Sequence, residues 1–265
     1  MAVERDRQFV QVIIKAFDLL DIIKKEQPIG ISELSRKSNL KKTTVARLVS
    51  TLELVRMVEQ DPASLRFLLG LRALEYGSGV LENIEVHHKA RPLIEKFVNE
   101  RGTTVLVGVL DQHEVVYIDK VEASELYRII TFVGDRVPAH CTAIGKAMLA
   151  FLPPEEVRRI FSHKQLEAFT SKTITTLDDL EKDLAVIKEK GYALDKRERH
   201  NDLCSVSAPI FDHRGNVVAA IAVPRIYRTI SDAELVELGL QLAELATTIS
   251  SRLGWKLSSR LLAYE

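Results

Sequence analysis

Apolar residues recur every three or four positions near the N-terminus, and short breaks divide them into three helices. The spacing predicts a helix over residues 12–25 and a short helix over residues 33–37 capped by Ser32. A tight turn around Asn39 leads into a third helix from about Lys41 to Leu54. Two helices joined by such a turn outline a helix-turn-helix, so the pattern restricts this part of the chain to a small helical domain.

The third helix has one buried and one free face. Its apolar residues take positions i, i+3, i+4 and i+7 and belong in a core; they are Val45, Leu48, Val49 and Leu52. Residues 36–47 hold five basic residues and no acidic one. At the start of such a helix amides and hydroxyls meet phosphates, and a basic residue one turn deeper reaches base edges. The helix residues predicted to contact DNA are Lys41, Lys42, Thr43, Thr44, Arg47 and Ser50.

The stretch after the third helix predicts a β-hairpin and then a connecting helix. Short strands over 57–60 and 66–68 flank an Asp-Pro turn, and Arg66 on this wing is predicted to reach a flanking phosphate or the minor groove. Apolar residues at helical spacing continue to about Asn83. We therefore expect a winged helix-turn-helix domain over residues 1–70 and a linker helix over 71–84.

The remainder, residues 85–265, alternates helical and strand patterns. Helices are predicted over 85–100, 144–151, 154–161, 177–190 and 231–253, and strands over 105–110, 115–121, 127–132, 191–194, 205–211 and 217–224. Hairpins followed by helices predict an antiparallel sheet with helices packed on it, an α+β domain. A hydrophobic content of 46% over 265 residues is enough for two cores.

Several other classes of protein lack support. The N-terminus has no apolar stretch of the kind a secretory signal needs, and apolar runs are too short to span a bilayer, so we expect a cytoplasmic protein without a membrane partner. The two cysteines form no CxxC pair, and His200 and Cys204 are too loosely placed to indicate a metal site. The Gly134–Ala147 stretch lacks P-loop spacing. His140 and Cys141 have no orienting third residue. We expect no enzyme activity, no cofactor and no metal.

A set of short motifs follows one order along the chain: residues 39–45 with Arg47-Leu48, Asp61-Pro62 to Arg66-Phe67 with Leu69-Gly70, Pro138 to Ala147, Gly191 to Asp195, and Ser205 to Asp212. With these motifs the sequence resembles the IclR family of bacterial and archaeal transcription regulators from about Val12 to Gly254. The resemblance implies a GAF-like effector-binding domain behind the linker helix, and dimers or tetramers on pseudo-palindromic promoter sites. The chain departs from the family where Lys41 replaces a helix-starting Pro, Leu65 a wing Gly, and Leu68 a basic residue.

The resemblance also implies positions that face a small-molecule effector. Motif matching places them at Ala143, Ile144, Gly145, Asp195, Ser205, Ala222 and Pro224, with apolar positions at Leu126, Ile129, Val137 and Leu203. The loop before Gly145 enters a helix whose first amides can hold a carboxylate, which favours an organic acid. Ala222 and Pro224 stand where the family often has hydroxyls, which favours an aromatic or longer-chain acid. The alternatives are that Gly145 permits close packing, Asp195 caps a turn and Ser205 satisfies a strand end.

The resulting hypothesis is a ligand-responsive regulator that binds double-stranded promoter DNA as a homodimer or homotetramer. It would control a catabolic operon in response to a small organic acid, with ligand acting through differential affinity for two states. One alternative is a small-molecule-binding or enzymatic α+β domain that carries the helix-turn-helix as an accessory. A second is an interaction module whose helix-turn-helix does not touch DNA.

Overall fold

The computed structural model describes residues 9–124 and 129–256. The chain forms two compact units, Met1–Asn83 and Ile84–Glu265. In the described ranges no helix has the length and apolar character needed to cross a membrane.

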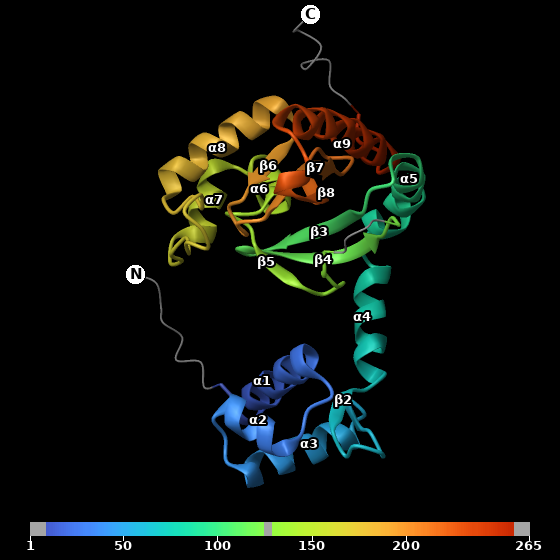
Figure 1. Cartoon of the computed structure of the whole chain (residues 1–265), viewed down its shortest axis with the longest axis vertical. Helices are drawn as coiled ribbons and strands as arrows, with labels where there is room; N and C mark the ends of the chain where they lie inside the picture. The colour runs from blue at the N-terminus through green and yellow to red at the C-terminus, as the bar shows by residue number, and fades with distance from the viewer. Residues whose placement is uncertain (1–8, 125–128, 257–265) are drawn as a thin grey trace, which may run out of the picture. The chain divides into compact units, whose positions relative to one another are not determined.

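The N-terminal unit is a three-helix domain with a hairpin (Figure 1). It contains α1 (Gln11–Glu26), α2 (Ile31–Ser38), α3 (Lys42–Leu54) and the antiparallel strands β1 (Val58–Gln60) and β2 (Phe67–Leu69). The apolar residues of each element meet in one core, whose fully covered members include Leu19, Ile23, Leu34, Val45 and Val58. The helical spacing therefore predicted the three helices and the face that α3 buries, whereas Phe17 of the apolar stripe on α1 is exposed.

The start of α2 differs from the prediction. Gly30, not Ser32, is the N-cap, and the Gly30 amide donates to the Glu33 carboxylate at 3.0 Å. This bond satisfies an amide that the helix leaves free, so the helix begins two residues earlier than predicted. At the other end Asn39 adopts the left-handed conformation with φ of 56°, as predicted for the turn into α3.

Helix α4 (Arg72–Glu82) follows the hairpin and runs without interruption through its two glycines. None of its residues is buried. Three of its large apolar side chains are exposed, from 59% for Tyr76 to 67% for Leu74, and Leu81 is half-buried. Among the described residues, the helix therefore contributes no fully buried side chain to a core.

The second unit is built on one six-stranded antiparallel sheet of strand order β5-β4-β3-β8-β7-β6. Its strands are β3 (Val105–Asp111), β4 (Glu114–Val121), β5 (Arg136–Pro138), β6 (Ala193–Lys196), β7 (Leu203–Phe211) and β8 (Val217–Ile226). Residues 219–223 of β8 are buried without exception. Because side chains alternate between faces along a strand, both faces of the sheet are covered.

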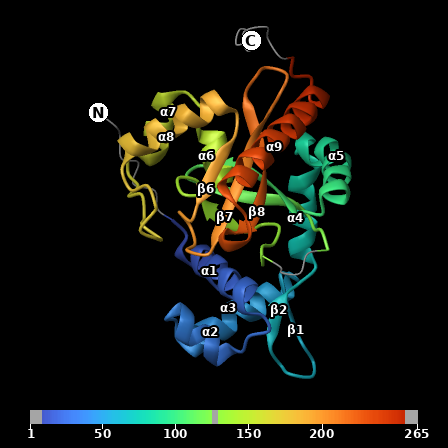
Figure 2. The ribbon, with the colours of Figure 1, turned by 45° about the horizontal axis from the view of Figure 1, so that its top comes forward.

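Helices α5 (Glu85–Arg101) and α9 (Asp232–Arg252) lie side by side, with α9 along β7 and β8 (Figure 2). The other face packs against α6 (Ala143–Leu149), with α7 (Pro154–Phe161) and α8 (Leu177–Lys190) beyond it. The structure is thus α+β, with helices on both faces of a sheet whose strands all pair antiparallel.

Two strands in this unit lie at other residues than predicted. Residues 129–132 are not in a strand, and the edge strand is β5 instead, after a turn in which Gly134 has φ of 83°. Strand propensity favoured 129–132, but the backbone of β4 pairs with residues 136–138. Strand β6 begins at Ala193 because Gly191 ends α8 in the left-handed conformation.

Candidate functional site

The free face of α3 carries the residues predicted to contact DNA. Thr44 is half-buried, and the five that are exposed are Lys41, Lys42, Thr43, Arg47 and Ser50. The exposure follows from the opposite face, where Val45 and Val49 are 0% and 1% exposed. Among the residues that the structure describes, the three cations on this face form no ion pair. Three positive charges on one helix face are thus available to a polyanion.

The wing places Arg66 differently from the basic residues of α3. The Arg66 guanidinium donates to the Glu33 carboxylate at 2.6 Å and to the Pro28 carbonyl at 2.9 Å. It therefore ties the wing to the start of α2, and its contact with DNA stays a prediction. Leu65 at the hairpin turn has φ of 57° and is 65% exposed, a conformation that glycine adopts more readily.

Strands β6, β7 and β8 bring together the sheet residues predicted to face an effector. Asp195 pairs with Ser205, and Ser205 pairs with Pro224, so the three lie in one row. Ala222 lies two residues before Pro224 on the same face and packs in the core that contains α6. Leu203 belongs to this face by the same alternation, and it is half-buried.

The remaining apolar positions lie toward the other edge of the sheet. Val137 is half-buried on β5, where it pairs with Val115. Ile129 is half-buried, and its carbonyl accepts from Lys120 at 3.4 Å. Leu126 lies outside the described residues.

The first turn of α6 combines close packing with unbonded amides. Thr142 occupies the N-cap, but its hydroxyl donates to the Pro138 carbonyl at 2.7 Å and caps no amide. Within the described residues, the backbone amides of residues 143–145 donate no hydrogen bond. A side chain at Gly145 would lie 2.3 Å from the backbone of Ala139, so this glycine is required for packing.

Asp195 stabilises the turn after β6 through a hydrogen bond. Its carboxylate accepts the Glu198 amide at 2.7 Å and closes a turn in which Arg197 has φ of 69°. Burial is the main reason that the pKa of Asp195 rises to about 7. The carboxyl group is therefore partly protonated near neutral pH, and it can donate as well as accept a hydrogen bond.

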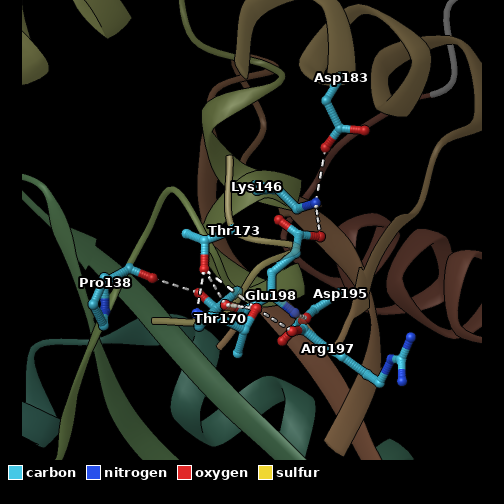
Figure 3. Close-up of polar contacts among 9 residues, drawn as sticks. Pro138, Lys146, Thr170, Thr173, Asp183, Asp195, Arg197 and Glu198 are labelled. Atoms are coloured by element: carbon cyan, nitrogen blue, oxygen red, sulfur yellow. Dashed lines mark hydrogen bonds and ion pairs between the residues drawn. The ribbon is translucent and has the colours of Figure 1, made fainter. Parts of the chain in front are cut away.

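A buried ion cluster holds this turn against α6 and α8 (Figure 3). The Lys146 ammonium lies 2.8 Å from Asp183 and 2.6 Å from Glu198. Burial alone would lower the pKa of Lys146, but the two carboxylates raise it above its ordinary value. Thr173 donates to the Glu198 carbonyl at 2.6 Å. The turn is thus fixed by long-range contacts.

Sequence reasoning missed two residues beside this site. Tyr117 is buried on the α6 side of the sheet, because it pairs with Gly108, which packs against Ile144. Arg199 follows the Asp195 turn, and its guanidinium stacks on Phe169 at 4.0 Å. Arg199 stands in the charged run 196–200, which local pattern alone leaves as a solvated loop, and Tyr117 stands in the strand predicted over 115–121 without any signal for a site.

A winged helix-turn-helix with an unpaired basic face, followed by a separate α+β unit, defines a DNA-binding transcription regulator. Comparison with known families agrees with this class. Residues 12–62 match the IclR helix-turn-helix domain, and residues 78–251 match the bacterial transcriptional regulator IclR C-terminal domain. The chain belongs to the IclR family of transcription regulators.

Relatives along nearly the whole length are regulators too. The chain is 30% identical over 247 residues to the HTH-type transcriptional regulator XynR of Escherichia coli, covering 93% of this chain and 98% of that protein. It is 29% identical to the transcriptional repressor IclR of the same organism, covering 92% and 90%. The crystal structure of Thermotoga maritima IclR is 31% identical with a TM-score of 0.76, covering 93% and 100%. The chain is thus a regulator and not an enzyme.

The fold also recurs in a more distant structure. An IclR homolog of Microbacterium hydrocarbonoxydans complexed with 4-hydroxybenzoate is 21% identical, with a TM-score of 0.74 over 91% of this chain and 98% of that one.

Proposed function

We propose that α3 enters the major groove of promoter DNA with its free face toward the bases. The observation that carries this proposal is the exposed, unpaired cations Lys41, Lys42 and Arg47 on a face whose reverse is buried in the domain core. Lysines at the helix start suit phosphates, and an arginine one turn deeper suits guanine edges. The operon is proposed to be catabolic; one relative that is 28% identical is named the acetate operon repressor of Salmonella typhimurium.

Fluorescence anisotropy with the adjacent promoter tests this assignment. We expect Lys42→Ala to weaken binding to all sequences and to reduce the salt dependence of log K by about 1. Arg47→Ala should cost about 1–3 kcal/mol and relax base preference. Lys164→Ala, an exposed lysine in the other unit, is the control. Unchanged affinity in both α3 variants would refute the proposed face.

We propose further that the α6 face of the sheet binds a small organic acid. The unbonded amides of residues 143–145 and the row formed by Asp195, Ser205 and Pro224 support this proposal. Ala222 and Pro224 offer no side-chain hydroxyl, so an aromatic or longer-chain acid should bind better than a two-carbon one. Titration calorimetry with a graded acid panel tests this, and binding of very small polar acids alone would contradict it.

The functional unit is proposed to be a homodimer or a pair of dimers. Exposed apolar side chains on α1 and α4 support this, including Phe17 at 62% and Val80 at 61% exposure, because apolar surface of this kind usually marks an interface. Ligand would shift the spacing of paired α3 helices on two half-sites through α4. Light scattering of Val80→Ser with Leu74→Ser tests the assembly. An unchanged mass would exclude α4 from the interface.

A further inference from the structure

The Arg199 side chain contains a buried hydrogen-bond donor without an acceptor among the described residues. The residue as a whole is half-buried, but its Nε atom is fully buried and has no hydrogen-bond partner. Among the residues that the structure describes, its side chain makes no ion pair, and its guanidinium stacks on the Phe169 ring at 4.0 Å. Buried donors are normally satisfied, because leaving one unbonded costs free energy.

Arg199 lies near the loop that enters α6, because its guanidinium stacks on Phe169, whose ring is 6.2 Å from that of His140. Burial raises the pKa of the Cys141 thiol to about 12, and the charge of Arg199 is the largest influence in the opposite direction. Burial likewise raises the pKa of Tyr117, and Arg199 again opposes it. Arg199 is therefore within electrostatic reach of two groups that flank the proposed effector face. Both groups are neutral near pH 7, so neither neutralises Arg199.

The acidic groups nearest to Arg199 along the chain are engaged elsewhere. The Asp195 carboxyl closes its own turn through the Glu198 amide. The Glu198 carboxylate binds Lys146 at 2.6 Å. The Asp202 carboxylate, three residues after Arg199, lies 4.0 Å from the Arg228 guanidinium. None of the three forms an ion pair with Arg199, and no described carboxylate serves as its counter-ion.

The other cations on this side of the sheet show that an unmatched charge is exceptional. Lys146 has two carboxylate partners. Lys120 lies 2.6 Å from Glu122 and donates to the Thr131 carbonyl at 3.1 Å. The fold therefore gives Lys146 and Lys120 carboxylate partners, whereas Arg199 has none among the described residues.

We propose that Arg199 is the counter-ion for the effector, whose carboxylate it binds through its planar pair of N–H donors. A guanidinium fork matches the two oxygens of a carboxylate, and the half-buried position leaves part of the side chain accessible to a ligand. The aromatic ring of Phe169 holds the guanidinium plane in place. This inference rests on the proposed binding of an acid on the α6 face, and it adds Arg199 to the α6 amides as a group that binds the acid.

The test compares four forms of the full-length chain by calorimetry and thermal unfolding. They are the natural sequence, Arg199→Met, Arg199→Lys and the control Arg197→Met, which removes an equal charge two residues away, where the guanidinium stacks on Tyr227. The probes are benzoate, 4-hydroxybenzoate, hexanoate and phenyl phosphate, with 4-hydroxybenzamide as the neutral counterpart of the second acid.

We expect at least one carboxylate to bind the natural protein, and Arg199→Met to weaken that binding about 10- to 100-fold. Arg199→Lys should be intermediate and Arg197→Met unchanged. The neutral amide should bind equally weakly to the natural protein and to Arg199→Met. Without ligand, Arg199→Met should unfold at the same or a higher temperature, because it removes an unsatisfied buried donor while keeping the apolar stem.

Four results would overturn the inference. If Arg199→Met binds the acid with natural affinity, the carboxylate sits elsewhere on the α6 face, and only the proposed function survives. Arg199-dependent binding of phenyl phosphate alone would assign the site to a phosphate ester instead. If no acid binds the natural protein, the proposed acid binding and the role of Arg199 both fail. If ligand-free Arg199→Met unfolds at a clearly lower temperature, Arg199 has a structural role instead.

Discussion

Replacing Asp195 by Asn should make the stability of the C-terminal unit depend less on pH. The pKa of this carboxyl rises from 3.8 to about 7 in the folded state, mainly through burial. The folded state thus holds a proton that the unfolded state releases near pH 4. The stability that Asp195 contributes is therefore complete below pH 4 and is lost as pH rises toward 7.

The magnitude follows from the shift itself. Each pH unit between the unfolded and folded pKa values changes the free energy of unfolding by about 1.4 kcal/mol, which gives about 4 kcal/mol over the whole window. Asn keeps a side-chain oxygen that can accept the Glu198 amide, and it carries no charge. Asp195→Asn should therefore match the natural protein near pH 4 and exceed its stability by several kcal/mol at pH 8.

The assay is urea unfolding followed by tryptophan fluorescence between pH 4 and pH 8. The chain contains a single tryptophan, and Trp255 stacks on Phe211 at a centroid distance of 5.2 Å, so the signal reports on the C-terminal unit. Asp178→Asn, an exposed carboxylate on α8, is the control for a simple loss of charge. A difference between Asp195→Asn and the natural protein that stays constant across this range would show that the turn amides keep Asp195 ionised, and the argument from burial would fail.

Three further outcomes are expected. Leu65→Gly should stabilise the N-terminal unit by about 1 kcal/mol in thermal unfolding. Leu65 has φ of 57°, and the left-handed backbone conformation costs a residue with a side chain about that much free energy. A loss of stability would show that the Leu65 side chain packs against the domain. Arg66→Met should weaken promoter binding without changing the salt dependence of log K, since the Arg66 guanidinium is hydrogen-bonded to Glu33. A smaller dependence of log K on salt, as expected for Lys42→Ala, would mean that Arg66 contacts a phosphate directly. Lys146→Met should destabilise the C-terminal unit by about 3–5 kcal/mol in urea unfolding, because it leaves two carboxylates without their cation. A cost below about 1 kcal/mol would contradict a buried cluster.

Local pattern was sufficient where a structure depends on neighbours in sequence. The apolar spacing of α3 predicted its buried face, and with it the exposure of Lys42 and Arg47. Helices α7 and α8 have the predicted bounds because proline at the start of one and Gly191 after the other act within a single turn.

Local pattern was insufficient where contacts join distant segments. The edge strand was misplaced because pairing with β4, and not propensity, selects residues 136–138. The candidate effector residues were matched by motif, but their arrangement in one row depends on the register of β6, β7 and β8.

The sequence by itself determined that this chain has a helix-turn-helix with a basic face and an α+β unit behind it, since periodicity and turn residues act over a few positions. Only the tertiary structure decided which charges are satisfied. Arg66 pairs with Glu33 across 33 residues and Lys146 pairs with Glu198 across 52, whereas Arg199 forms no ion pair with a described residue and stacks on Phe169. Whether a charge is paired depends on its neighbours in space, and a one-dimensional pattern does not contain them.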